Sequence, residues 1–376
     1  MNGEAINNCA PVLHLYVHIP FCARICPYCA FYKERADSSQ TKRFCEALLG
    51  EAEQHRSRMT MRLETIFFGG GTPTALTTDQ LEFLLGGLRE RLDLHAVNEW
   101  SVEANPGSAS PRKANLLRDL GINRISLGVQ SWDDDLLKLL GREHDAAQAR
   151  DSFRTLREAG FKNLSIDLMF GLPGQTLEQW ESTLENTIAL EPDHISTYCL
   201  TYEEGTEFFV RQARGEFHED PDSDARFLES AMQLLERAGF EHYEISNYAR
   251  KGYASSHNRG YWAGEDYLGI GPSAFSTIGL ERYQNVSDYR SYSDLVLAGR
   301  SPINSREALT SAMKRTERIA LGLRTVEGIP SNELSQWPNE RREFEELGLL
   351  RAVNGHHVLT RKGKLVADTV AGAFVG

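Results

Sequence analysis

Residues 18–32 read HIPFCARICPYCAFY and hold three cysteines within eight positions, at Cys22, Cys26 and Cys29. They directly follow the apolar, β-like run LHLYVHI at residues 13–19. A closed structural zinc site takes four protein ligands, whereas this segment supplies only three thiols. A 4Fe–4S cube that is held by three cysteines leaves its fourth iron open to another ligand. The spacing therefore favours an iron–sulfur cluster with one open coordination position.

Two other interpretations of this cysteine cluster stay open. His18 could complete a zinc site, although it stands inside the β-like run and its side chain need not face the loop. The three thiols could also be grouped for structural reasons alone. The remaining cysteines, Cys9, Cys45 and Cys199, are scattered, and small buried side chains are the simplest interpretation of them. Such a distribution is a poor disulfide framework, so we expect a reducing compartment, the cytoplasm.

The composition indicates a globular protein with one large domain and one small one. The chain has 376 residues, of which 41% are hydrophobic and 25% charged, with a net charge of −12. The acidic balance and the lack of a long basic run argue against binding to nucleic acid through phosphate contacts. We expect no secretory signal, because the N-terminal stretch lacks a basic start and an apolar segment. We also expect no membrane span, because no run of about 18 apolar residues occurs.

Short β-like runs alternate with helical patterns along most of the chain. The β-like runs cover residues 13–19, 63–69, 99–105, 124–130, 164–170, 194–202 and 242–248. Helical patterns follow at residues 77–92, 110–121, 145–160, 177–190 and 222–238. This alternation predicts parallel βα units, and six or seven such units predict an α/β fold of the partial (β/α) TIM barrel type. A doubly wound open sheet is the competing fold.

The pattern changes near residue 290, so we predict a core domain of residues 1–290 and a small C-terminal domain of residues 291–376. The smaller domain has helical patterns at residues 310–324, 338–347 and 361–373. It also contains Asn354-Gly355, a two-residue hairpin signal between two strands. Helices with one hairpin indicate a helical, winged-helix-like domain. Such a domain can bind DNA, but the acidic balance favours a packing or lid role.

Polar residues stand where the predicted parallel strands end, which is where barrels of this type carry their chemistry. GGGTPT at residues 69–74 follows the second run, and we expect it to offer close backbone approach and exposed N–H donors to a carboxylate or phosphate. Strand alternation puts Glu103, Gln130 and Asp167 on the polar side of their strands. Each could be a buried structural side chain, but their convergence at one end of the barrel predicts a cavity for a polar ligand.

The C-x-x-x-C-x-x-C spacing followed by an aromatic residue resembles the signature of the radical S-adenosylmethionine superfamily. The similarity extends over residues 15–262 through LYVHIPFC, FFGGGTPT, SVEANPG, NRISLGVQSW, LGREH, SIDLMFGLPGQT, HYEISNYA and HNRGYW. As a set these segments resemble the family of oxygen-independent coproporphyrinogen oxidase and its relatives, most of all the HemW-like heme chaperones. The resemblance implies the radical S-adenosylmethionine partial barrel and a 4Fe–4S cluster whose open iron binds S-adenosylmethionine.

The resemblance also implies roles for single residues. Cys22, Cys26 and Cys29 match the cluster ligands. The residues that match the S-adenosylmethionine site are Tyr16, Tyr28, Gly70, Gly71, Thr72, Glu103, Gln130, Arg142 and Asp167. Carboxylates can accept hydrogen bonds from ribose hydroxyls, and Arg142 can pair with the carboxylate of the cofactor.

The segment HNRGYW at residues 257–262 is tied by the resemblance to heme binding. His257 would serve as the axial ligand, and Tyr261 and Trp262 would offer aromatic surface to the porphyrin. The alternative is a surface loop whose aromatic side chains pack on the barrel. The implied function is that of a heme chaperone that passes heme to acceptor proteins such as respiratory apocytochromes. The resemblance also allows a homodimer and peripheral association with a membrane.

Two positions in the cysteine loop bear on the branch of the family. Phe31 stands where the oxidase pattern has a further cysteine, which favours the chaperone branch. Ala30 stands where the chaperones commonly have Asp, which leaves the substrate more open than the cofactors. The alternative functions are an oxygen-independent coproporphyrinogen III oxidase and another radical enzyme that acts on a tetrapyrrole.

Overall fold

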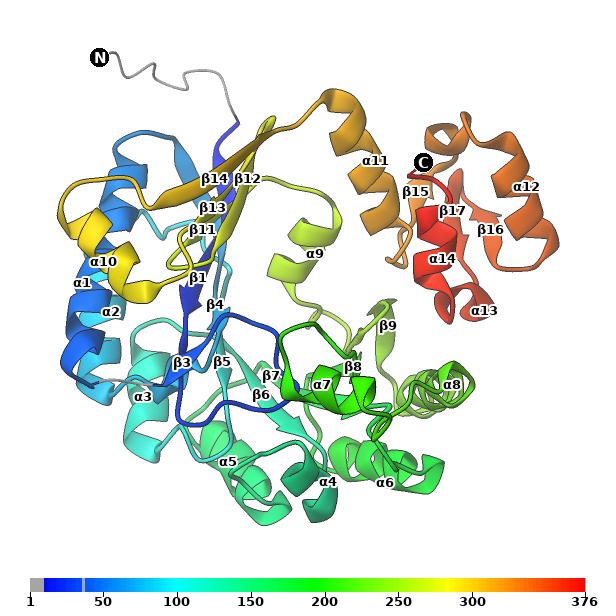
Figure 1. Ribbon diagram of the computed structural model, residues 1–376, viewed down its shortest axis with the longest axis horizontal. Helices are drawn as coiled ribbons and strands as arrows, with labels where there is room; N and C mark the ends of the chain where they lie inside the picture. Colours follow the sequence, from blue (N-terminus) through cyan, green and yellow to red (C-terminus); the bar gives the residue numbers. More distant parts are fainter. Residues whose placement is uncertain (1–9, 36–37, 376) are drawn as a thin grey trace. The chain divides into compact units, whose positions relative to one another are not determined.

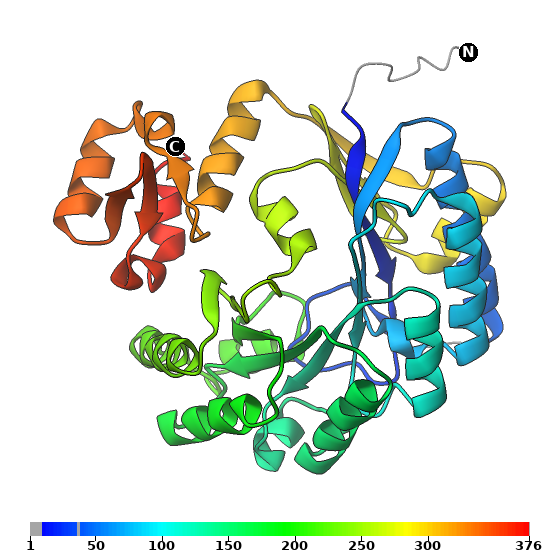
Figure 2. The same cartoon turned by 180° about the vertical axis from the view of Figure 1, so that it is seen from behind.

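The computed structural model describes residues 10–35 and 38–375, which form two compact units (Figures 1 and 2). Each unit is built from three separate segments of the chain. Unit 1 comprises the described residues of 1–168, 200–218 and 266–308, and unit 2 comprises those of 169–199, 219–265 and 309–376. Because the units are interleaved along the chain, they follow no single boundary, and the division at residue 290 stays a prediction.

Unit 1 is built on a mainly parallel sheet, as the alternating pattern predicts. Its five central strands pair in parallel in the order β1 (Val12–Ile19), β4 (Met61–Gly70), β5 (Glu99–Ala104), β6 (Arg124–Gln130) and β7 (Leu164–Phe170). The connecting helices lie side by side in chain order: α1 (Ser38–Arg56), α2 (Thr78–Arg91), α3 (Pro111–Asp119) and α5 (Ala146–Glu158) (Figure 1). All five strands are confirmed to within two residues of their predicted bounds.

Local capping signals set where these helices begin. The Thr77 side chain accepts the backbone N–H of Gln80, and the Gln80 side chain accepts that of Thr77, which is the predicted capping box. Ser110 caps α3 and is followed by Pro111 at the first helical position. Asp145 caps α5. Unit 1 also contains the short helices α4 (Asp134–Leu139) and α7 (Glu207–Ala213).

Unit 1 also contains a sheet extension that the sequence patterns do not predict. β11 (Tyr267–Ile270) pairs in parallel with β1, and the antiparallel strands β12 (Phe275–Ile278), β13 (Glu281–Asn285) and β14 (Ile303–Ala308) follow. α10 (Tyr289–Leu297) packs against α1. The buried carboxylate of Glu51 in α1 joins these elements. It accepts the backbone N–H of Gly271, the Asn285 amide and the Tyr292 hydroxyl at 2.5–2.8 Å.

Unit 2 contains three strands that pair antiparallel in the order β8 (His194–Cys199), β10 (Asn247–Ala249), β9 (Glu241–Glu244). The prediction of one strand over residues 242–248 is wrong. The chain turns between β9 and β10, where the Glu244 carboxylate accepts the backbone N–H of Ser246 and the amide of Asn247. Helix α6 (Leu177–Ile188) packs against α8 (Pro221–Arg237), and the Trp180 indole donates to the carbonyl of Phe227 at 2.9 Å.

The C-terminal segment of unit 2 has an apolar cluster of its own. It contains α11 (Ser311–Gly322), the 3₁₀ turn η2 (Ser331–Leu334) and α12 (Pro338–Glu346), with a small sheet in the order β15 (Ile329–Pro330), β17 (His356–Leu359), β16 (Leu350–Val353). The cluster is formed by Ile319, Leu323, Ile329, Leu334, Leu350, Leu359, Ala367, Val370 and Phe374. These residues come from helices and strands alike, and a separate domain of residues 291–376 stays a prediction.

The hairpin at Asn354-Gly355 is confirmed, with φ values of 49° and 81° at its two turn residues. The single helix predicted over residues 361–373 is wrong, because the chain forms α13 (Arg361–Lys364) and α14 (Ala367–Gly372) instead. The break falls at Val366, whose ψ of 34° is not helical, and Gly363 lowers the helical propensity of the first piece.

Two of the three scattered cysteines lie within the described residues, and neither is exposed. Cys45 is fully buried and Cys199 is partly buried, while Cys9 lies outside the described residues. Within residues 10–35 and 38–375, no helix combines the length and the apolarity that crossing a membrane requires.

Candidate functional site

The three clustered cysteines lie in the loop that leaves the carboxyl end of β1. Short strands β2 (Phe21–Cys22) and β3 (Glu34–Arg35) pair in parallel and close the loop at its base. Inside the loop, the backbone N–H of Cys29 donates to the carbonyl of Cys26 at 3.2 Å. All three side chains are partly buried. Burial raises the pKa of the Cys22 and Cys29 thiols, so charge must be supplied nearby for them to act as thiolates.

His18 is engaged in the wall of the loop and does not face the thiols as a ligand. Its Nε2 lies 3.0 Å from the carbonyl oxygen of Tyr32, and its Nδ1 lies 3.0 Å from the hydroxyl of Tyr16. Because a carbonyl only accepts, Nε2 carries the proton and Nδ1 accepts from Tyr16. Burial lowers the pKa of His18 to about 4, which keeps the ring neutral. Both nitrogens are therefore occupied, which weighs against a zinc site completed by His18.

The described residues also contain no group of three or more His, Cys, Asp or Glu side chains that could hold a single metal ion. A 4Fe–4S cube does not need such convergence, because each cysteine binds a different iron atom. The donor set of the loop, three thiols on one short segment, therefore fits a cluster better than a mononuclear site.

The glycine loop, residues 69–74 at the end of β4, packs directly on the cysteine loop around residues 22–29. A Cβ on Gly70, whose φ is +104°, would lie 2.4 Å from the His18 ring, and a Cβ on Gly71 would lie 2.7 Å from the backbone of Pro20. The backbone N–H groups of Gly71 and Thr72 donate to the carbonyls of Ile19 and Phe21, each at 2.8 Å. These glycines are thus needed for the close approach of two backbones.

The expectation of exposed N–H donors in this loop is wrong for three consecutive residues. Besides the two bonds to β1 and its loop, the backbone N–H of Gly70 donates to the carboxylate of Glu103. A ligand beside this loop would therefore meet side chains and carbonyl groups rather than these three donors. The loop continues into the 3₁₀ turn η1 (Pro73–Ala75).

Two polar side chains reach the sulfur atoms of the cysteine loop. The Thr72 hydroxyl donates to Sγ of Cys22 at 3.7 Å, and Nη1 of Arg142 donates to Sγ of Cys26 at 3.6 Å. Asn105, at the end of β5, connects these two side chains. Its Nδ2 donates to Oγ1 of Thr72 at 2.8 Å, and its Oδ1 accepts from Nη2 of Arg142 at 2.6 Å.

Sequence reasoning did not identify Asn105 as a site residue, although Asn105 ends the predicted strand of residues 99–105 that carries Glu103. The contact between Asn105 and Arg142 could not be inferred from the sequence, because Arg142 stands 37 residues further along the chain. Gly128 leaves space for the contact between the side chains of Asn105 and Arg142. A Cβ there would lie within 3.5 Å of the side chains of Gln130, Asn105 and Arg142. The polar strand ends thus converge, as the strand alternation predicts.

The acidic residues Glu103 and Asp167 lie on β5 and β7, the two strands that flank β6. The Asp167 carboxylate accepts the hydroxyl of Ser126 at 2.9 Å and that of Ser165 at 3.0 Å. Burial, and then the charge of Asp167, raise the pKa of Glu103 to about 8, so that Glu103 is mainly protonated at neutral pH. Gln130 ends β6 with a φ of +71°, next to a register shift against β7.

The two tyrosines of the predicted site support the loop. Tyr16 is partly buried, stacks on Phe67 with ring centres 6.3 Å apart, and donates to His18. The Tyr28 ring lies 6.1 Å from the ring of Phe208 in α7, and its hydroxyl shares a hydrogen bond with Arg142. Tyr28 therefore links the loop to the same guanidinium group that reaches Cys26.

A cavity of about 490 Å³ opens beside Cys26. Its wall includes Thr72, Asn105 and Arg142, together with Lys113, whose ammonium donates to the carbonyls of Thr74 and Ser108 at 2.6 and 3.0 Å. The wall is polar and carries positive charge, which suits the anionic sulfides and thiolates of a cluster. The residues present therefore fit an iron–sulfur cluster at this place.

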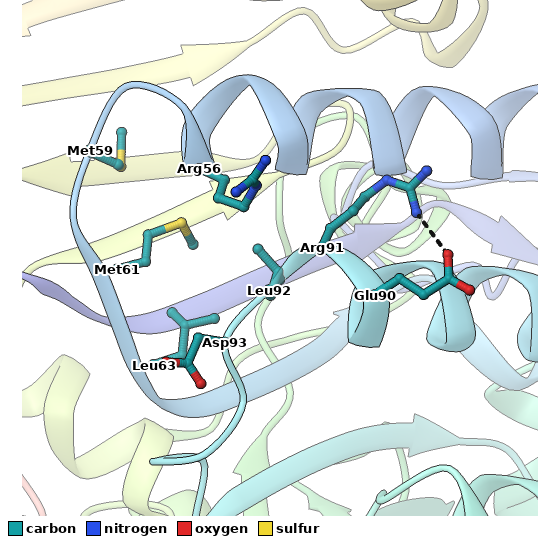
Figure 3. A pocket seen from close by; sticks show the side chains of 8 residues that line it. All are labelled: Arg56, Met59, Met61, Leu63, Glu90, Arg91, Leu92 and Asp93. Carbon is teal, nitrogen blue, oxygen red and sulfur yellow. Dashed lines mark ion pairs between the residues drawn. The ribbon is translucent and has the colours of Figure 1, made fainter.

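A second cavity, of about 410 Å³, lies where α1 and α2 end and β4 begins (Figure 3). It is lined by Arg56, Met59, Met61, Leu63, Glu90, Arg91, Leu92 and Asp93. An ion pair of 3.7 Å joins Arg91 to the exposed Glu90. None of the predicted site residues lines this cavity, so the strand ends around the cysteine loop remain the candidate site.

The segment HNRGYW belongs to unit 2 and forms a helix, α9 (Ser256–Trp262), rather than a loop. Ser255 caps it by accepting the backbone N–H of Asn258. His257 and Tyr261 are four residues apart and share one face of the helix. Tyr261 is 48% exposed, and His257 is partly buried.

The other face of α9 is turned to the C-terminal segment of the same unit. Arg259 pairs with Glu327 at 2.6 Å, and the guanidinium of Arg324 lies 5.8 Å from the ring centre of Trp262. Trp262 lies next to Arg324, but its ring also packs edge to face on that of Tyr261, with ring centres 5.7 Å apart. His257 and Tyr261 share one side of the helix, so the structure keeps the two predicted aromatic rings in contact.

Comparison with known proteins agrees with this architecture. The profile of the Radical SAM superfamily matches residues 16–186. The Heme chaperone HemW of Bacillus subtilis (strain 168) is 37% identical over 96% of this chain and 98% of its own length. The protein of the same name from Mycobacterium tuberculosis (strain H37Rv) is 33% identical over 96% and 94%. That of Escherichia coli (strain K12) is 39% identical over 71% of each chain.

Among solved structures, the coproporphyrinogen III oxidase (HemN) of Escherichia coli, described as a radical SAM enzyme, superposes with a TM-score of 0.84. The identity is 24%, and the alignment covers 98% of this chain and 91% of that chain. The similarity confirms the predicted α/β radical SAM fold. Because the sequence identity to the curated chaperones extends over nearly the whole chain, this protein belongs to the HemW family of the radical SAM superfamily.

Proposed function

We propose that this protein is a heme chaperone that carries a 4Fe–4S cluster and S-adenosylmethionine, binds heme, and transfers it to acceptor proteins such as respiratory apocytochromes. The observation that carries the proposal is the 37% identity to a protein named heme chaperone over 96% of the chain. The cytoplasm is the proposed compartment. A homodimer and peripheral membrane association stay predictions.

Cys22, Cys26 and Cys29 hold the cluster in this proposal. When bound, the cluster supplies one electron and an open iron that takes the amino and carboxylate groups of S-adenosylmethionine. Glu103, protonated at neutral pH, can both donate to and accept from a ribose hydroxyl. Four of the five N–H donors of Arg142 are already given to Asn105, the carbonyl of Gly128, Cys26 and Tyr28, so one remains for the cofactor carboxylate.

Heme binding is proposed for α9, through His257, Tyr261 and Trp262. An imidazole is a good axial ligand for heme iron, and a half-exposed tyrosine ring offers apolar area to the porphyrin without first being uncovered. The ring of Trp262 packs edge to face on that of Tyr261, with ring centres 5.7 Å apart, and extends this aromatic surface.

The test is a hemin titration of the anaerobically reconstituted protein, followed by the Soret band. We expect His257→Ala to weaken hemin binding at least tenfold and to shift the Soret maximum, because the axial ligand is lost. His95→Ala, a change at an exposed histidine in unit 1, serves as the matched control. Unchanged affinity and spectrum in His257→Ala would remove His257 from the proposal.

The same reconstituted protein tests the competing function. Incubation with coproporphyrinogen and S-adenosylmethionine under anaerobic conditions should give no protoporphyrinogen if the protein is a chaperone. Transfer is measured by mixing the heme-loaded protein with an apocytochrome and following the spectrum of the acceptor. Formation of protoporphyrinogen would replace the chaperone assignment with that of the oxidase.

A further inference from the structure

The three sulfur atoms of the cysteine loop accept hydrogen bonds from three different kinds of donor. Cys22 accepts from the hydroxyl of Thr72, Cys26 from the guanidinium of Arg142, and Cys29 from the backbone N–H of Phe31. The donor to Cys29 is part of the loop itself. The other two come from separate segments, one after β4 and one after α4, and depend on tertiary packing.

The direction of the bonds at Cys22 is determined by a chain of three side chains. A guanidinium only donates, so the oxygen of the Asn105 amide must face Nη2 of Arg142. The amide nitrogen then points at Thr72 and donates to its hydroxyl oxygen. Since this oxygen already accepts from Asn105, its single proton is directed away from the amide, toward Sγ of Cys22.

This arrangement has a consequence for a bound cluster. Hydrogen bonds to the cysteine sulfurs stabilise the more negative, reduced state and so raise the reduction potential. Low dielectric strengthens them, and Thr72 is 4% exposed. An asparagine that touches no sulfur can therefore act on the cluster through the orientation of its neighbours.

We propose that Asn105 is a positioning residue that, aligned by Arg142, directs the Thr72 hydroxyl onto Cys22 and thereby raises the reduction potential of the cluster. The inference rests on the proposed function only in that a 4Fe–4S cluster occupies the loop. It does not depend on heme binding or on transfer to an acceptor.

The experiment measures the midpoint potential of the reconstituted cluster by a redox titration monitored by electron paramagnetic resonance. Thr72→Val removes the hydroxyl at nearly constant volume and should shift the potential to more negative values. Thr72→Ser keeps the hydroxyl and should leave it unchanged. Asn105→Ala should shift it in the same direction as Thr72→Val, while Asn115→Ala, at an exposed asparagine of α3, should not.

A double variant identifies the route of the effect. If Asn105 acts on Cys22 through Thr72, adding Asn105→Ala to Thr72→Val should shift the potential by less than Asn105→Ala does alone. Resonance Raman spectra give a second readout, in which loss of the bond to Cys22 should raise an Fe–S(Cys) stretching frequency. Fully additive shifts would overturn the role of Asn105.

The outcomes separate this inference from the proposed function. Iron analysis of the unaltered protein comes first, and absence of a cluster there would overturn both. If every variant holds a cluster of the same potential, the positioning role is wrong and the cofactor assignment stands. If Asn105→Ala cannot hold a cluster, the comparison of Thr72→Val with Thr72→Ser decides alone. Equal potentials in that pair, or loss of the cluster in Thr72→Ser, would count against the proposal.

Discussion

The cysteine loop of unit 1 and helix α9 of unit 2 carry the motifs proposed for the cluster and for heme, and they are held in different ways. The cysteine loop is bound by backbone hydrogen bonds to the glycine loop, by a buried histidine, and by side chains from the segments after β4 and α4. α9 is a seven-residue helix with a serine cap, one exposed ion pair and an aromatic ring that is half exposed.

The difference suggests that the two sites have different tasks. A cofactor that stays bound benefits from a rigid, preorganised cage, because little is lost in ordering the protein around it. A surface that receives and releases a ligand needs accessible groups and gains less from such rigidity. Changes in the cysteine loop should therefore have larger effects on cofactor content and stability than changes at α9.

Loss of one thiol from the cage should have the largest effect. Cys26→Ser leaves two sulfur ligands and removes the sulfur that Arg142 contacts, so we expect loss of nearly all bound iron from about four atoms per chain. Iron and sulfide analysis after anaerobic reconstitution measures this. Cys199→Ser, a partly buried cysteine of unit 2, is the control and should retain its iron. Full iron content in Cys26→Ser would show that Cys26 is not a ligand of the cluster.

Adding one methyl group between the two loops should come next. Gly70→Ala places a Cβ 2.4 Å from the His18 ring at a φ of +104°, so we expect a loss of about 3 kcal/mol in the free energy of unfolding. Gly107→Ala has a φ of +81° and meets no atom within 4 Å, so it should lose only about 1 kcal/mol. Thermal or urea unfolding compares the two. Equal losses would mean that the loops do not pack as tightly as described.

The buried Glu103 should make stability depend on pH. Its folded pKa of about 8 lies above the ordinary value of 4.5, so the folded state holds the proton more tightly than the unfolded state. Stability is therefore lost as pH rises through about 5 to 8. The full shift corresponds to about 5 kcal/mol, and solvent screening of the partly buried carboxyl reduces this to about 2 kcal/mol. Glu103→Gln, which stays neutral, should flatten this dependence in the protein without cofactors.

Calorimetric scans at a series of pH values measure that effect, with Glu90→Gln as the control because the Glu90 side chain is 80% exposed. A pH profile that Glu103→Gln leaves unaltered would show that Glu103 is ionised in the folded protein. In that case it would be ready to accept hydrogen bonds but unable to donate one.

The smallest effect is expected at α9. Arg259→Ala removes the ion pair with Glu327, whose two side chains are 56% and 52% exposed, so we expect a cost of about 0.2–1 kcal/mol. Hemin affinity should stay within a factor of about two, because Arg259 lies on the face opposite His257. A loss of stability comparable to that of Gly70→Ala would show that α9 is held as firmly as the cysteine loop.

Much of the fold around the site is predictable from local signals. The strands at residues 63–69 and 124–130 and the caps at Thr77, Ser110 and Asp145 depend on neighbours within a few positions, which a sequence window contains. Helix α1 and strands β11–β14 were missed, because they are stabilised by contacts such as that of Glu51 with Asn285, 234 residues apart.

Residue types and their spacing define the chemistry of the site: three thiols at a spacing suited to a cluster, glycines after the second strand, and acidic residues on the polar sides of two strands. How these groups act depends on the folded chain. In the folded chain, His18 contacts the carbonyl of Tyr32 instead of the thiols, and N–H groups of the glycine loop donate to backbone carbonyls. Asn105 connects Thr72 with Arg142. The reason is physical, since residue type determines what a side chain can bind, whereas the donors and acceptors still available depend on which distant segments meet it in the folded chain.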